Sequence, residues 1–151
     1  PILASMEGSG DQSWPPSPPL QSLDIQSQGD RETALLLGMA GSGHWSVAVE
    51  LDTRNERLSV DIACRIKNLQ VEQSGPDMRS SYRTMLQPVR ASDNQARIGE
   101  ILVSSNRQQN DEYQNSSIQV LEDGIEIVPC IVATRSPITL RWWYEMTISE
   151  R

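Results

Sequence analysis

The sequence predicts an all-β protein, a single antiparallel β-sandwich or up-and-down β-barrel of about eight strands. Three observations predict this fold class. Apolar and polar residues alternate with period two in several segments, short polar turns separate those segments, and no segment has the periodicity of a helix. With 151 residues, of which 37% are hydrophobic, the chain suffices for one core. We therefore expect one antiparallel β domain over residues 31–151.

The clearest strand is predicted over residues 138–148. Successive side chains of a strand point to opposite faces, so a strict alternation places one set in the core and the other toward solvent. The core set consists of every second residue, Ile138, Leu140, Trp142, Tyr144, Met146 and Ile148.

Two hairpins and three further strands complete the prediction. Residues 45–51 and 58–66 alternate in the same way around a polar turn, 52–56, which we interpret as an ordinary hairpin tip. Asp123-Gly124 favours a type I′ turn, which places Val120 opposite Ile127. The remaining strands are expected over residues 33–39, 82–89 and 96–104, the last as a covered central strand with Glu100 in its middle.

The first 30 residues differ from the rest of the chain. They hold five of the nine prolines and no Lys or Arg. Such a Pro/Ser-rich segment lacks the apolar periodicity of a packed element, so we expect a flexible tail, disordered or extended, over residues 1–30. No signal peptide is visible. The chain starts at Pro1 and can be N-terminally truncated, so the cellular compartment stays unknown. We expect the protein to be soluble.

The charge and the basic residues exclude several function classes. The net charge is −7, whereas a nucleic-acid-binding protein normally has a basic surface, so we expect no nucleic-acid partner. No apolar run approaches the roughly 20 residues of a membrane span, so we expect no membrane partner. Twelve of the 13 basic residues are Arg and only Lys67 is Lys, which rules out a GxxxxGK[ST] phosphate loop.

Metal and cofactor sites are also not predicted. Cys64 and Cys130 lie 66 residues apart, and His44 is the single histidine, which does not match the close ligand spacing of a zinc site. We expect both cysteines to be free thiols, although the sequence does not decide whether they pair.

The candidate ligand-binding or partner-binding residues are Arg141, Trp143 and Glu145. Because Trp142 and Tyr144 belong to the core set, Trp143 points to the opposite face between a cation and an anion. Such a tryptophan can stack on a sugar ring or anchor a partner protein, unless another segment covers it. The long polar connections, 67–80 and 105–116, and a sheet edge near Pro129 are further candidate surfaces.

We therefore expect a non-enzymatic binding or interaction module with an unidentified protein or small-molecule partner. The alternative is a lipocalin-like barrel that holds a small apolar ligand against Trp45, Trp142 and Tyr144. A hydrolase that uses His44 or Glu100 comes third. No serine lies in a GxSxG elbow, neither cysteine has a reactive context, and a buried carboxylate has 12 arginines available as partners. Whether the protein is an enzyme is uncertain, and the sequence favours a protein that is not one.

Overall fold

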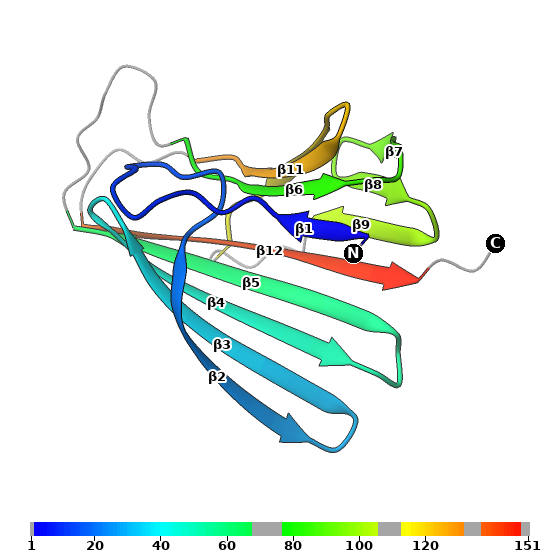
Figure 1. Ribbon diagram of the computed structural model, residues 1–151, viewed down its shortest axis with the longest axis horizontal. Coiled ribbons are helices and arrows are strands. Elements are labelled where there is room, and N and C mark those ends of the chain that lie inside the picture. The colour runs from blue at the N-terminus through cyan, green and yellow to red at the C-terminus, as the bar shows by residue number, and fades with distance from the viewer. Residues whose placement is uncertain (1, 68–76, 106–112, 132–136, 149–151) are drawn as a thin grey trace.

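The computed structural model describes residues 2–67, 77–105, 113–131 and 137–148. These residues form twelve strands in two antiparallel sheets (Figure 1). The four-stranded sheet has the order β1-β6-β11-β10, with β1 (Leu3–Ser5), β6 (Ser80–Thr84), β11 (Gly124–Pro129) and β10 (Ser116–Val120). The eight-stranded sheet has the order β2-β3-β4-β5-β12-β9-β8-β7, with β2 (Leu20–Gln28), β3 (Arg31–Ala40), β4 (Gly43–Asp52), β5 (Arg57–Ile66), β12 (Ile138–Ile148), β9 (Ile101–Ser105), β8 (Gln95–Ile98) and β7 (Pro88–Ser92).

The two sheets form a sandwich. In the described residues each sheet ends in two different strands and does not close on itself, so the barrel alternative is wrong. The all-β antiparallel prediction is confirmed. The strand number is higher than expected, because two predicted strands each divide into two and residues 2–30 add β1 and β2.

The core lies between the sheets and matches the predicted alternation. Strand β12 has the predicted bounds, and the side chains of Leu140, Trp142 and Tyr144 are almost completely buried. Ile148, which the alternation also assigns to the core set, is exposed at the end of the strand. Trp142 meets Trp45 of β4 edge to face, with ring centroids 5.8 Å apart. The β4–β5 hairpin is also confirmed, with Val47 paired to Ile62.

Residues 2–30 are not a separate segment, contrary to the prediction of a tail before the β domain. Strand β1 pairs with β6, and β2 pairs with β3. Between them Pro15, Ser17 and Pro18 are buried. The Ser17 hydroxyl also accepts a hydrogen bond from the backbone N–H of Ser81 (3.0 Å). The segment is extended, but its backbone hydrogen bonds come from the two sheets, which a composition-based reading does not reveal.

Two predicted strands are divided by turns. The segment 82–89 leaves the four-stranded sheet after Thr84 and enters the other sheet at Pro88, with Met85 91% exposed between them. The segment 96–104 is the β8–β9 hairpin, because Gly99 takes a φ of +60°, which favours glycine in a two-residue turn. Glu100 is therefore an exposed turn residue and not the middle of a covered strand.

The β10–β11 hairpin turns one residue earlier than predicted. Ile118 pairs with Ile127 and Val120 pairs with Ile125, so Gly124 belongs to β11. A Cβ at Gly124 would lie 2.2 Å from the carbonyl oxygen of Tyr82. The glycine therefore serves the close approach of β6, and not the positive φ of a type I′ turn.

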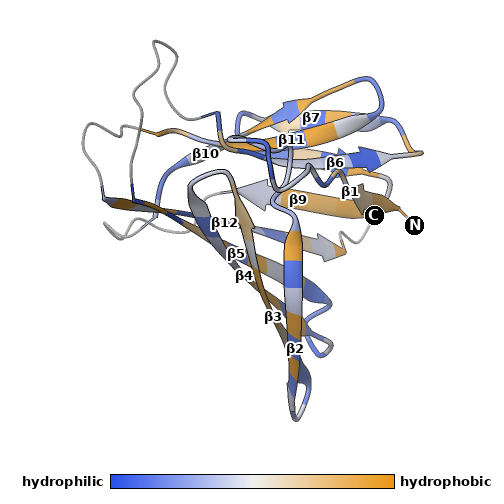
Figure 2. Ribbon diagram, turned by 60° about the vertical axis from the view of Figure 1, so that its left-hand side comes forward, coloured by the Kyte–Doolittle hydropathy of each residue, from blue (hydrophilic) through white to orange (hydrophobic). Residues whose placement is uncertain are grey.

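The eight-stranded sheet is larger than the sheet that covers it. The hairpin ends of β2 and β3 and the adjoining end of β4 project beyond the four-stranded sheet, and we call this part the wing (Figure 2). The other end of β3 is covered, since Leu36 packs against the core and Ala40 is buried. Leu23 and Ile25 of β2 lie on the same face as the core residues, yet they are 59% and 62% exposed. The wing therefore carries a core pattern without a second layer.

Candidate functional site

A groove runs over the outer face of the eight-stranded sheet, the face opposite the core. Two neighbouring rows of paired residues cross the sheet there. One row runs Leu35, Ala48, Asp61, Trp143, and the other runs Leu37, Ser46, Ala63, Arg141. Because large side chains stand at the ends and small ones in the middle, the rows leave a hollow along β4 and β5.

The groove consists of two depressions that share Ala48 and Asp61. The polar depression has a volume of about 370 Å³ and is lined by Thr33, Ala48, Glu50, Arg57, Ser59, Asp61 and Trp143. The more apolar depression has a volume of about 590 Å³ and is lined by Asp24, Leu35, Leu36, Leu37, Ser46, Val47, Ala48, Asp61, Ala63, Thr139 and Arg141. We call the two together the outer-face groove.

Asp61, Arg141 and Tyr113 form a hydrogen-bonded cluster at the meeting point of the two depressions. Arg141 Nη2 donates to Asp61 Oδ2 at 2.9 Å and to the Tyr113 hydroxyl at 2.8 Å. The Tyr113 hydroxyl in turn donates to Asp61 Oδ2 at 2.6 Å. The Arg141 guanidinium also lies 4.6 Å from the centroid of the Tyr113 ring. These contacts hold a cation and a carboxylate in fixed positions at the groove wall.

Trp143 and Glu145 lie on the same outer face, but only Trp143 lines the groove. Trp143 is half-buried beside Asp61 and Arg57. Glu145 pairs with Ser59 in the next row, and its carboxylate lies 4.0 Å from Arg57. Of the three predicted residues, Arg141 and Trp143 line the groove, whereas Glu145 reaches it only through Arg57.

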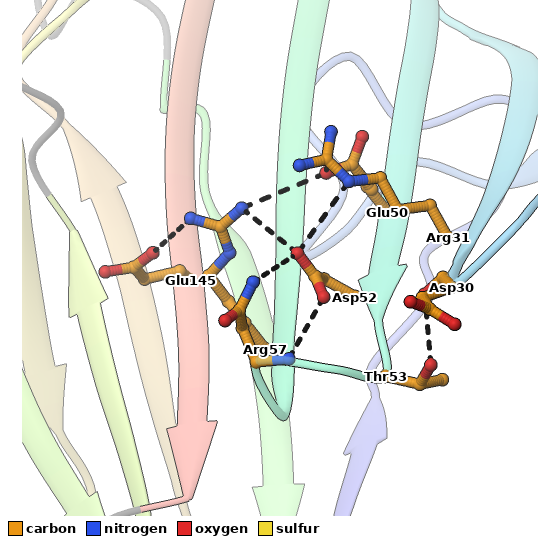
Figure 3. Close-up of polar contacts among 8 residues, drawn as sticks. Asp30, Arg31, Glu50, Asp52, Thr53, Arg57 and Glu145 are labelled. Atoms are coloured by element: carbon orange, nitrogen blue, oxygen red, sulfur yellow. Dashed lines mark hydrogen bonds and ion pairs between the residues drawn. The ribbon is translucent and has the colours of Figure 1, made fainter.

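An ion-pair network closes the polar end of the groove (Figure 3). Arg57 lies 4.0 Å from each of Glu50, Asp52 and Glu145, and Arg31 lies 3.7 Å from Asp52. Asp52 is buried, and Asn55 donates to it from its side-chain amide (2.8 Å) and its backbone N–H (3.0 Å). These two bonds, with the charges of Arg31 and Arg57, lower the pKa of the Asp52 carboxyl. The 52–56 segment is thus a hairpin tip, as predicted.

The residues predicted to line an interior cavity fill the core instead. Trp142 packs on Trp45, and its indole N–H donates to the Ser80 hydroxyl at 3.2 Å. Only Tyr144 reaches a hollow, which has a volume of about 240 Å³ and lies between the sheets. Its hydroxyl is hydrogen-bonded to the Tyr82 hydroxyl. Burial raises the pKa of Tyr144 well above its ordinary value, and the Tyr82 phenol adds to this shift.

The hydrolase hypothesis named His44 or Glu100, and these two residues lie far apart. His44 is exposed on β4, in the row of Thr139 at the start of β12. Glu100 is exposed next to Ile101, which pairs with Ile148 at the end of β12. Nine residues of strand separate these rows, or roughly 30 Å at about 3.3 Å per residue. His44 and Glu100 therefore do not belong to one site.

The remaining predicted features are distributed over the fold. Cys64 is buried and Cys130 is exposed, and both are free thiols, as predicted. Pro129 is buried in β11, an inner strand, so the predicted sheet edge there is wrong. Most of the two long connections, 68–76 and 106–112, lies outside the described residues.

Within the described ranges, no group of three or more His, Cys, Asp or Glu side chains is placed to hold a metal ion. The same part of the chain contains no helix that could span a lipid bilayer.

Several groove residues were not predicted from the sequence, Asp61, Arg57 and Tyr113 above all. A signal for part of the groove was present, because the outward positions of β4 and β5 carry the small residues Ser46, Ala48, Ser59 and Ala63. Small outward side chains on β4 and β5, next to the large outward side chain of Trp143 on β12, indicate a hollow beside Trp143. Tyr113 lies in the connection 105–116, one of the candidate surfaces, but strand periodicity does not single it out because it lies outside the strands.

Comparisons of the chain with models of known protein families, with curated proteins and with solved structures find no match. The candidate site is therefore defined by its geometry alone.

Proposed function

We propose that this protein is a non-enzymatic binding module that takes a carbohydrate in the outer-face groove. The observation that carries the proposal is the combination of Trp143 with Asp61 and Arg141 at a hollow floored by small side chains. A half-buried indole supplies an apolar face for a sugar ring, while a carboxylate and a guanidinium supply acceptors and donors for its hydroxyl groups.

The size and charge of the groove favour a neutral saccharide. Depressions of about 370 and 590 Å³ match the range of small-ligand sites. The charged lining residues are three carboxylates, Asp24, Glu50 and Asp61, and two guanidinium groups, Arg57 and Arg141. This balance disfavours an anionic ligand such as a phosphate ester. Polar groups on both sides of an apolar strip suit a molecule with hydroxyl groups around its ring.

The test is binding of the full chain to an array of neutral and acidic oligosaccharides, followed by calorimetric titration with the sugars that bind. Ala48→Leu fills the floor shared by both depressions without removing a polar group, and we expect it to abolish binding. Ala91→Leu, on exposed β7, is the matched control and should bind like the wild type. Trp143→Ala should raise the Kd by about tenfold, and Trp143→Phe by less. Wild-type protein that binds no sugar, or unchanged binding by Ala48→Leu, would refute the proposal.

A second candidate function is binding of a small apolar ligand in the inter-sheet hollow of about 240 Å³. The eight-stranded sheet supplies one wall, with Leu36, Val47, Val49, Val60 and Ile62. The rest of the lining includes the polar residues Ser5, Glu7, Ser17 and Ser80, besides Tyr82 and Tyr144, whose hydroxyls are hydrogen-bonded to each other. This arrangement supports a ligand with one apolar side, which packs on the eight-stranded sheet, and neutral polar groups on the other side.

The neutral fluorescent probe N-phenyl-naphthylamine tests this second candidate. We expect its fluorescence to rise on addition of the protein and the rise to be lost in Val49→Phe, which fills the hollow. Val89→Phe, at an exposed position of β7, is the matched control and should keep the signal. The candidate fails if Val49→Phe binds the probe as the wild type does while keeping the wild-type circular dichroism spectrum.

A further inference from the structure

The outer edge of β2 is an unpaired strand edge at the end of the wing. In the described part of the chain no strand pairs with it. All residues from 21 to 28 are exposed. An unpaired edge presents a row of backbone N–H and C=O groups, which is a template for another extended chain.

The other three edges of the two sheets are short or irregular. Strand β7 begins at Pro88, which lacks a backbone donor, and has a bulge between Arg90 and Ser92. Strand β1 has three residues. Strand β10 has five, and its Ile118 N–H donates to the Asp93 carbonyl at 2.8 Å. Short strands, proline, bulges and covering loops are the features with which proteins prevent edge-to-edge association.

Strand β2 has none of these features between residues 22 and 28. The segment contains no Pro and no Lys, and its single register shift lies at its start, between Leu20 and Ser22. Leu23 and Ile25 stand exposed on its inner face. Unlike the other three edges, this part of β2 is therefore free of features that would prevent pairing with another strand.

We propose that β2 pairs antiparallel with β2 of a second copy of this chain, around a two-fold axis at Ile25. Directly opposite residues of an antiparallel pair lie on the same face of the sheet, whereas neighbouring residues of one strand lie on opposite faces. A two-fold axis perpendicular to the sheet must therefore place one residue directly opposite its own copy. Centring on Ile25 pairs all seven residues from 22 to 28. Centring on Asp24 would set two carboxylates directly opposite each other, which is destabilising.

The side chains of β2 complement themselves in this register. On the outer face Asp24 lies opposite Gln26 of the second copy, so a carboxylate meets an amide donor twice. The two groups already bond within one strand, where Gln26 Nε2 donates to Asp24 Oδ2 at 3.0 Å. On the inner face Ile25 meets its own copy, with Leu23 of each chain diagonally beside it. This self-complementarity is why the occupant is a second copy and not an unrelated strand.

Sedimentation equilibrium of the full chain over a range of concentrations tests the proposal. We expect a reversible association to twice the monomer mass. Ile25→Lys places two ammonium groups opposite each other and should leave only monomer. Val89→Lys, on the opposite edge strand at 59% exposure, is the matched control and should still dimerise. Both substitutions are at exposed positions, and circular dichroism verifies that the variants fold.

Disulfide cross-linking tests the register. In a Cys130→Ser background, Ile25→Cys should form an intermolecular disulfide under mild oxidation. Leu23→Cys alone should not, because it faces Ser27 of the second copy, whereas the pair Leu23→Cys and Ser27→Cys should cross-link. A wild type that stays monomeric at every concentration overturns the proposal, as does a dimer that survives Ile25→Lys. Cross-linking by Leu23→Cys alone overturns the register.

Discussion

The part of the eight-stranded sheet that lies beneath the four-stranded sheet, which we call the covered half, has the same alternation of apolar and polar residues as the wing. The two parts differ in the burial of the apolar side chains. In the covered half, Trp142 and Tyr144 of β12 are completely buried beneath the four-stranded sheet. In the wing, Leu23 and Ile25 occupy the same face and remain mostly exposed. Alternation therefore indicates which face of a sheet is apolar, and the second layer decides whether that face contributes to stability.

Truncation of an apolar side chain should have a large effect on the free energy of unfolding in the covered half and a small effect in the wing. Trp142→Ala should lower the free energy of unfolding by about 3–5 kcal/mol, because it leaves a cavity between the sheets. Leu23→Ala should change it by less than about 1 kcal/mol, since the side chain is already in water. Chemical denaturation of both variants measures the contrast. Equal losses would mean that the wing is covered in solution, as pairing with a second copy would partly achieve.

Two glycines give the next contrast. Gly124→Ala should cost about 1–3 kcal/mol, because its Cβ would lie 2.2 Å from the Tyr82 carbonyl oxygen in the covered layer. Gly29→Ala, at the tip of the wing, meets no atom within 4 Å and pays only for its φ of +61°, about 1 kcal/mol. Thermal unfolding midpoints compare the two. A larger loss in Gly29→Ala would contradict the close packing of β11 on β6.

Alkaline pH should act on the covered half. Burial raises the pKa of the Cys64 thiol from 9.0 to about 12. The unfolded thiol ionises first, so the free energy of unfolding is unaffected below pH 9 and falls as the pH rises from 9 toward 12. Cys64→Ala should remove part of this fall, whereas Cys130→Ala, at an exposed thiol, should not. Denaturation curves measured at several alkaline pH values test this difference.

Acidic pH should act on the β4–β5 hairpin tip, which adjoins the wing. Bonds from Asn55 and the charges of Arg31 and Arg57 lower the pKa of Asp52 from 3.8. A carboxyl with a lowered pKa stabilises the fold above its unfolded value, and this contribution is lost as the pH falls through the folded value. Asp52→Asn should be less stable than the wild type at neutral pH, and the two should converge below pH 3.8. A constant difference at all pH values would show that Asp52 acts only as a hydrogen-bond acceptor.

The alternation predicted which face the β12 residues of the candidate site occupy, but it did not predict which residues of other strands lie beside them. The position of Trp143 and Arg141 on the face opposite Trp142 was predictable, because period two fixes the face of each residue of a strand. Asp61 was not, because its place beside both residues depends on β5 pairing with β12, strands that are far apart in the sequence. Glu100 was misplaced because one glycine turned a predicted strand into a hairpin.

The strand content, the inner and outer faces and the β4–β5 hairpin follow from the amino-acid sequence alone, since these depend on local periodicity and turn residues. The entry of residues 2–30 into both sheets, the filling of the core by its aromatic side chains and the exposure of the wing are visible only in the folded molecule. The physical reason is that backbone hydrogen bonds and burial are satisfied between distant segments. Alternation within one strand does not specify which strand lies beside it or which layer covers it.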